Sequence, residues 1–190
     1  MADNATYRDH LIDEVIDACI KHLRTHPNDH EKLFYLANAF FLKGQFDKAS
    51  FCYIKAVNQN PRNPVYYTHL GHTYRELGDR DQAVASYESV LSLNPRFADA
   101  HFNIGQIFYE NKAFDKALAS FVNALAINPR YAAARYYVAR IYEDQGAISK
   151  ALKEYRQIVE DTLGDKLMRS SVTIDLGAVF SDLGLLDQAE

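Results

Sequence analysis

The sequence predicts an all-α fold, a solenoid of antiparallel helix pairs, because three features recur along the chain at one spacing. An alanine and an aromatic residue each recur every 34 residues, and so does a proline. A fixed period of this length indicates a repeat protein, in which each unit is one supersecondary element that stacks on its neighbours. Four of the five prolines carry this period: Pro27, Pro61, Pro95 and Pro129.

Each unit is numbered so that the recurring proline is position 32, which gives units 30–63, 64–97, 98–131 and 132–165. Positions 4, 7, 8 and 11 have the spacing of one apolar helix face, and positions 20, 24 and 27 have that of a second helix. These two helices are called helix A and helix B. Position 20 is always alanine: Ala49, Ala83, Ala117 and Ala151. Position 24 is always aromatic: Tyr53, Tyr87, Phe121 and Tyr155.

The residues between these faces predict where the helices begin and end. Position 15 is glycine in three units (Lys112 stands there in unit 3), and glycine supplies the left-handed residue that ends helix A. Position 18 is aspartate in three units, at the start of helix B, where its charge is stabilised by the helix dipole. Asparagine before the recurring proline ends helix B, because the residue before proline is disfavoured in the α region. Pro64 fits the first turn of a helix.

These residues resemble the tetratricopeptide-repeat (TPR) family, whose pattern is Leu-Gly-x-x-Tyr, then Ala-x-x-x-Phe, then Pro. Unit 2 shows it as Leu70, Gly71, Tyr74, Ala83 and Tyr87. The resemblance covers nearly the whole chain and implies a right-handed superhelical solenoid. The chain departs from the family at position 4, which is often tryptophan, and we expect weaker packing there in units 3 and 4. Position 4 reads Leu33, Tyr67, His101 and Arg135.

Both ends of the sequence differ from a full unit. Residues 1–29 are predicted to be an N-terminal half-repeat, a lone helix B over roughly residues 7–25, because Ile12–Leu23 fits positions 17 to 28. Residues 166–190 fit a fifth unit that is truncated and shifted by four residues, with Leu176, Gly177 and Phe180 at positions 7, 8 and 11. The insertion near Gly164 predicts a longer helix at the junction between units 4 and 5.

Composition argues against several classes of function. The net charge of −4 and the pI near 6.0 are unlike those of proteins that neutralise many phosphates, so we expect no nucleic-acid partner. No apolar run approaches the roughly 20 residues needed to span a bilayer, so no membrane insertion is expected. The first residues lack the pattern of a signal peptide, which favours a cytoplasmic location.

We find no candidate for catalysis or for metal and cofactor binding, so the chain is not expected to be an enzyme. Its glycines fall at repeat positions and form no phosphate-binding cluster. The histidine pairs His69/His72 and His22/His26 lack the further ligands that a metal site needs. Cys19 and Cys52 lie on helix packing faces and are expected to be buried thiols.

The resemblance implies that helix A lines a concave groove through positions 2, 5, 6, 9, 12 and 13. Most of the aromatic residues at these positions are expected to be exposed, as binding hot spots are often aromatic. Acidic residues at positions 12 and 13 favour a basic or amphipathic partner. The lysine of the carboxylate clamp found in chaperone-binding TPR domains is absent from position 5. The predicted partner-binding groove residues are Phe34, Tyr35, Asn38, Phe41, His69, His72, Glu76, Phe102, Asn103, Gln106, Tyr109, Tyr136, Tyr137 and Arg140.

The sequence therefore predicts a non-catalytic protein–protein interaction module that binds a peptide or helix of a partner protein in this groove. One alternative is a structural scaffold that forms homo-oligomers or larger complexes through its uncapped C-terminal end, where Leu183, Leu185 and Leu186 would lack a neighbour. Another is the substrate-recruiting arm of a longer enzyme.

Overall fold

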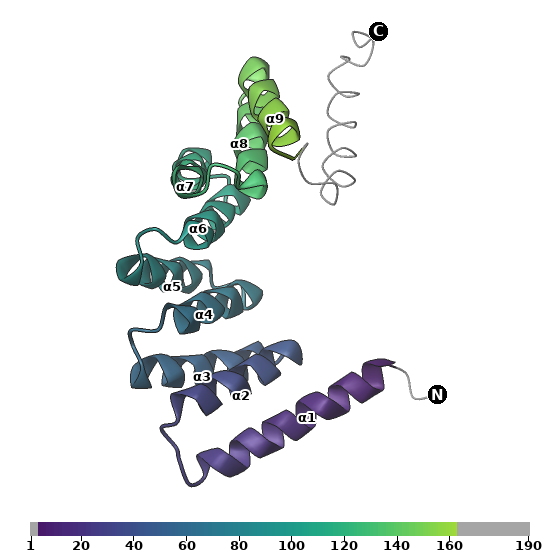
Figure 1. Cartoon of the computed structure of the whole chain (residues 1–190), viewed down its shortest axis with the longest axis vertical. Helices are drawn as coiled ribbons and strands as arrows, with labels where there is room; N and C mark the ends of the chain where they lie inside the picture. Colours follow the sequence, from purple (N-terminus) through teal and green to yellow (C-terminus); the bar gives the residue numbers. More distant parts are fainter. Residues whose placement is uncertain (1–3, 163–190) are drawn as a thin grey trace. The chain divides into compact units, whose positions relative to one another are not determined.

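The computed structural model describes residues 4–162, which form nine α-helices and no strand (Figure 1). Figure 1 draws them in chain order, each joined to the next by a short connection. Their bounds are α1 Asn4–Leu23, α2 His30–Leu42, α3 Phe46–Gln59, α4 Pro64–Glu76, α5 Arg80–Leu93, α6 Ala98–Glu110, α7 Phe114–Ile127, α8 Ala132–Asp144 and α9 Ile148–Thr162.

The chain divides into two compact units, Met1–Ile107 and Phe108–Glu190, and the division falls inside α6. We call these the first and second compact units, to distinguish them from the sequence repeats. In the first, α1 packs on α2, α2 pairs with α3, α3 packs on α4, and α4 pairs with α5. In the second, α7 packs on α8 and α8 pairs with α9. This consecutive helix packing confirms the predicted all-α fold of helix pairs. The predicted fifth repeat and its junction lie outside the described residues.

In the pairs α2–α3, α4–α5 and α8–α9, an aromatic ring of helix B packs against a small residue of helix A. The four position-24 rings and the four position-20 alanines are all essentially inaccessible to water. Burying one such ring contributes about 1.5–3 kcal/mol. In the α4–α5 pair, a Cβ added to Gly71 would lie only 2.7 Å from Cε1 of Tyr87. A residue without a side chain at position 8 therefore lets these two helices approach closely.

The helix ends match the sequence prediction. Gly44, Gly78 and Gly146 have φ between 69° and 76°, the left-handed conformation expected after helix A. Lys112 adopts the same conformation with φ of 57°, although a side chain there costs about 1 kcal/mol or more. Pro64 is the first residue of α4, and position-18 aspartates occupy the first turns of α3, α5 and α7.

Two further predictions can be compared with the helices. The lone first helix spans residues 4–23 rather than 7–25, since the chain turns at the residues before Pro27. Both cysteines are buried, as predicted, and burial raises the pKa of the Cys52 thiol to about 11. A thiol with this pKa stays protonated near neutral pH and is a poor nucleophile.

At position 4 of repeat 4, the chain has an arginine that forms ion pairs in place of an apolar side chain. The guanidinium of Arg135 lies 2.9 Å from Glu154 and 3.9 Å from Asp161, both on α9. It also donates a hydrogen bond to the carbonyl of Pro129. The α8–α9 pair is thus joined by charge at the position where the family often has tryptophan.

The left-handed residue in the α6–α7 connection gives a test of the fold. We expect Lys112→Gly to raise the free energy of unfolding by about 1 kcal/mol, because glycine adopts this conformation without a Cβ clash. Lys153→Gly, in the exposed interior of α9, should lower it by about as much. Urea unfolding followed by circular dichroism measures both changes. Equal losses in the two variants would contradict the assigned conformation.

Candidate functional site

In the first compact unit, the buried tyrosines of helix B extend their hydroxyl groups to the residues of helix A. The hydroxyl of Tyr53 donates to Oδ1 of Asn38 and lies 3.4 Å from Nδ1 of His69. The hydroxyl of Tyr87 lies 2.8 Å from Nδ1 of His72. A buried tyrosine hydroxyl needs a partner, and here that partner is a side chain at position 6 or 9 of helix A.

Arg75 extends this network from α4 to α6. Its Nη1 donates to Oε1 of Gln106 at 3.1 Å and, over 3.4 Å, to Oδ1 of Asn103. Its guanidinium also donates to the hydroxyl of Tyr87. That hydroxyl can then donate its own proton to Nδ1 of His72, an arrangement that requires a neutral imidazole. We call Asn38, His69, His72, Arg75, Asn103 and Gln106 the polar A-face.

The two histidines of the polar A-face are half-buried, and this changes their titration. Burial lowers the pKa of His69 below its ordinary value. Burial also lowers the pKa of His72, and the nearby positive charge of Arg75 adds to the effect. Both imidazoles are therefore neutral near pH 7 and can accept a hydrogen bond at one ring nitrogen.

In the second compact unit, aromatic rings and charges replace the histidines. The ring of Tyr137 stacks on Phe121, with centroids 5.0 Å apart, and Tyr109 meets it edge-on at 5.2 Å. The hydroxyl of Tyr109 donates to Asp144 over 3.3 Å and accepts a hydrogen bond from Arg140. We call Tyr109, Tyr137, Arg140, Glu143 and Asp144 the aromatic A-face.

The expectation that most groove aromatics are exposed is wrong for the described residues. Of the seven, Tyr35 alone is exposed, at 50% of its surface. Phe34 packs its ring against Tyr66 at 4.9 Å and against His69 at 5.0 Å. The remaining five are half-buried: Phe41, Phe102, Tyr109, Tyr136 and Tyr137.

The predicted groove residues thus fall into three groups. Asn38, His69, His72, Asn103 and Gln106 meet on the polar A-face, and Tyr109, Tyr137 and Arg140 meet on the aromatic A-face. Phe34 and Phe41 pack against the core of the first compact unit, and Tyr136 packs against that of the second. Phe102 is half-buried on α6. Tyr35 and Glu76 are exposed, as are Glu110 and Asp144, the other acidic residues at position 13.

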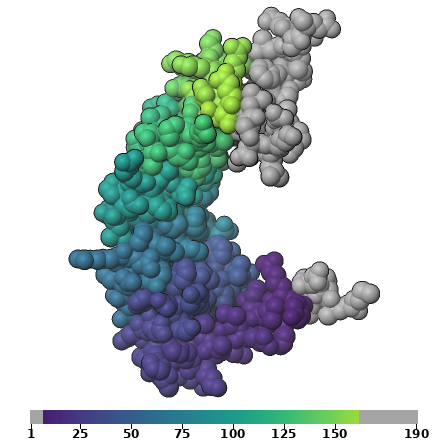
Figure 2. Space-filling model, viewed as in Figure 1, coloured from purple at the N-terminus to yellow at the C-terminus, as the bar shows by residue number. Residues whose placement is uncertain are grey.

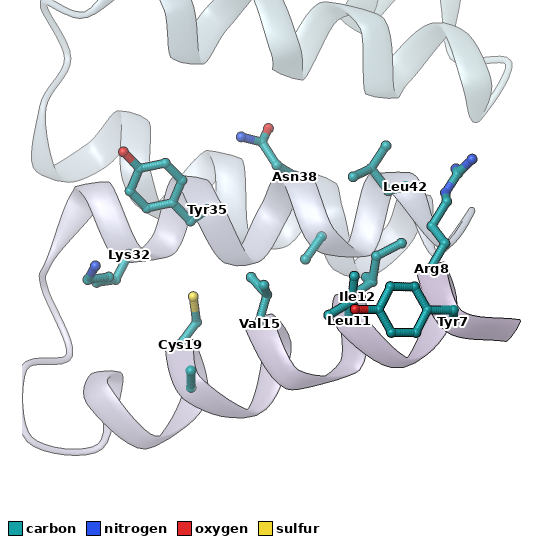
Figure 3. A pocket seen from close by; sticks show the side chains of 12 residues that line it. Tyr7, Arg8, Leu11, Ile12, Val15, Cys19, Lys32, Tyr35, Asn38 and Leu42 are labelled. Atoms are coloured by element: carbon teal, nitrogen blue, oxygen red, sulfur yellow. The ribbon is translucent and has the colours of Figure 1, made fainter. Parts of the chain in front are cut away.

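The prediction missed a hollow of about 560 Å³ between α1 and α2 (Figure 3). Tyr7, Leu11 and Val15 line it from α1, and Tyr35 and Leu42 line it from α2. The signal was present in the sequence. Leu42 occupies position 13, which is acidic in the next three repeats, and Val15 occupies position 20, which is otherwise alanine.

The histidine pairs do not form a metal site within residues 4–162, where no three histidine, cysteine or carboxylate side chains are grouped as metal ligands. His22 instead lies 2.8 Å from Asp29 and stacks on His26. No helix of this described part is long and apolar enough to cross a membrane.

Comparison with known proteins shows which family models match this sequence. Three family models match, described as "Tetratricopeptide repeat" over residues 69–129 and 108–173 and as "TPR repeat" over residues 37–78. The comparison with curated proteins gave no match.

Several solved structures share the fold. "Crystal structure of MamA" superposes with a TM-score of 0.77 at 22% identity, over 86% of this chain and 97% of that one. "Crystal structure of YrrB: a TPR protein with an unusual peptide-binding site" superposes with a TM-score of 0.68 at 19% identity, over 86% of this chain and 84% of that one. TTC0263, a thermophilic TPR protein of Thermus thermophilus, superposes with a TM-score of 0.63 at 25% identity, over 90% of this chain and 94% of that one.

The half-buried histidines predict a loss of stability in mild acid. Below about pH 6.5 the unfolded chain protonates His69 and His72, whereas the folded chain, with lowered pKa values, does not. The unfolded state then binds more protons, so the free energy of unfolding falls as the pH drops through this range. Replacing both histidines by glutamine should flatten this dependence in urea titrations. If the free energy of unfolding of the double variant fell with pH as steeply as that of the wild type, the burial of the two histidines would be contradicted.

The environment of Phe34 gives a second prediction. Phe34→Ala should lower the free energy of unfolding by about 2 kcal/mol or more, because its ring packs among Tyr53, Tyr66 and His69. The neighbouring Tyr35→Ala should cost under about 1 kcal/mol, because half of that side chain is already in solvent. Chemical denaturation of the two variants compares them directly, and similar losses would show that the two rings are equally buried.

Proposed function

We propose that this chain, which belongs to the tetratricopeptide-repeat family, binds a peptide or helix of a partner protein on the helix-A side chains of its repeats. A protein-interaction module is the general role that the family supports. The finer proposal is that the polar A-face and the aromatic A-face each bind a segment of such a partner. No catalytic step is part of this proposal.

The observation that carries the proposal is the hydrogen-bonded arrangement of the polar A-face. Its side chains are held in place by Tyr53 and Tyr87, whose rings are fixed in the core. Ordering a free side chain on binding costs about 0.5–1.5 kcal/mol. Side chains that are already ordered avoid much of this cost, so such a surface favours binding.

The chemistry of the two faces indicates what the partner segment offers. Arg75 and Gln106 are half-buried and present donors and acceptors that suit the peptide groups and polar side chains of a bound segment. Asn103, predicted to face the groove, is instead buried, and its amide oxygen accepts a hydrogen bond from Arg75. Glu76 on α4 and Asp144 on α8 are exposed and favour basic residues in the partner. The structural neighbour YrrB is described as having an unusual peptide-binding site, which supports a peptide as the ligand class here.

A random library of displayed linear peptides, selected against the full chain, tests this proposal. We expect selected peptides to lose at least about tenfold in affinity, or 1.4 kcal/mol, in one of two double variants. The first is His69→Ala with Gln106→Ala on the polar A-face. The second is Tyr109→Ala with Arg140→Ala on the aromatic A-face. For each selected peptide, the variant that loses binding identifies the face that the peptide occupies.

Matched controls lie on exposed positions of helix B. Glu88→Ala on α5 and Asn123→Ala on α7 should leave the affinity unchanged. Circular dichroism and unfolding curves show whether each variant is folded. Peptides that bind both double variants as tightly as the wild type would refute the proposed surfaces.

A further inference from the structure

The first helix has an uncovered face where every other described helix B is covered. In all four repeats the position-20 residue is buried, and Ala49 and Ala151 each share a core cluster with the position-8 alanine of their own helix A. Its equivalent on α1 is Val15, which is 46% exposed. The buried residues of α1, Ile12, Ile16 and Cys19, belong to the cluster that α1 shares with α2. The open flank of α1 is therefore the face that normally receives a helix A.

The residues around this flank are apolar beyond what the repeat pattern requires. Tyr7 is 62% exposed and Leu42 is 58% exposed, and both line the hollow between α1 and α2 (Figure 3). The space-filling view shows part of α1 on the surface of the first compact unit (Figure 2). Contiguous exposed apolar surface of this kind marks an interaction site.

The charges of the hollow indicate what covers it. Among the described residues that line it, Arg8 and Lys32 are charged and none is a carboxylate. An occupant with an apolar face and acidic flanks would complement both the apolar side chains and these two cations. Because the hollow borders the face of α1 that corresponds to the helix-A-facing side of the other helices B, the fitting shape is an amphipathic helix with a small residue at its centre.

One segment of this same chain has that pattern. Residues 170–183 lie outside the described part of the structure. Their sequence matches the helix-A pattern, with Leu176, Gly177 and Phe180 at positions 7, 8 and 11. The segment contains Asp175 and Asp182 and no basic residue. It therefore offers both the packing residues of a helix A and the sign of charge that the hollow lacks.

We propose that the hollow between α1 and α2 of one copy receives residues 170–183 of a second copy, so that the helix A of one molecule pairs with α1 of the next. Gly177 then lies against the flank of Val15, as Gly71 lies against the helix B of its own pair. Phe180 occupies the space left where Cys19 replaces the aromatic residue of position 24. The contact is heterologous, because two different surfaces meet.

Sedimentation equilibrium of the full chain tests this assembly. The wild type should show a mass that rises with concentration above the 21.7 kDa of one chain. Val15→Glu, which blocks the hollow, and Leu176→Glu, which alters the segment, should each weaken association at least about tenfold. Val122→Glu on α7, at a valine that is 49% exposed, is the matched control and should associate like the wild type.

Mixing the two charged variants distinguishes this contact from a symmetric one. Val15→Glu keeps an intact segment and Leu176→Glu keeps an intact hollow, so the equimolar mixture should form a one-to-one dimer of limited size. A symmetric interface would leave the mixture as dissociated as its components. That outcome would overturn the proposal. A wild type that is monomeric at every concentration would also overturn it, even if residues 170–183 then occupied the hollow of their own molecule.

A synthetic peptide of residues 170–184 keeps the test decisive if Leu176→Glu fails to fold. The peptide should bind the full chain, dissociate its oligomers and lose affinity at least about tenfold for Val15→Glu. The same peptide carrying Leu176→Glu is its control. Equal binding of both peptides, or binding that ignores Val15→Glu, would overturn the assignment of the hollow.

Discussion

The contact between an aromatic ring of helix B and a small residue of helix A is the constraint on which the rest of this structure depends. In the α4–α5 pair, the ring of Tyr87 takes the space that a side chain at Gly71 would fill. The ring is buried, so its hydroxyl group must find a hydrogen-bond partner. That partner is His72 on helix A. The side chains of the proposed binding surface are thus positioned by the same residue that holds the pair together.

The second compact unit shows what changes when the residue types at these positions change. Phe121 has no hydroxyl group, and Tyr137 stacks on its ring instead of accepting a hydrogen bond. At position 9, Arg140 cannot accept a hydrogen bond. The hydroxyl of Tyr155 donates instead to Glu143, which also lies 3.6 Å from Arg140. Burial, followed by the charge of Glu143, raises the pKa of Tyr155 and keeps it a donor.

The period of the sequence is enough to predict the helix pairs, because burial of positions 20 and 24 recurs with it. It also locates the helix ends, since Gly44 and Pro64 have conformational preferences that act locally. Exposure of the groove aromatics could not be predicted in the same way. Phe34 is half-buried because rings from α3 and α4 meet it, and the spacing within a single helix does not reveal such neighbours. The hollow was missed because it depends on a departure from the pattern, at Leu42 and Val15, rather than on the pattern itself.

The hollow and the polar A-face are chemically different surfaces that share a residue. Asn38 lines the hollow, and its amide oxygen also accepts the hydrogen bond of Tyr53, whose hydroxyl lies beside His69. A helix seated in the hollow would therefore touch one end of the hydrogen-bonded chain that positions the A-face side chains. Any effect on affinity between the two surfaces must be reciprocal, because both act on the same folded state. Self-association and partner binding would then be linked through a single amide, without a change in the helix pairs.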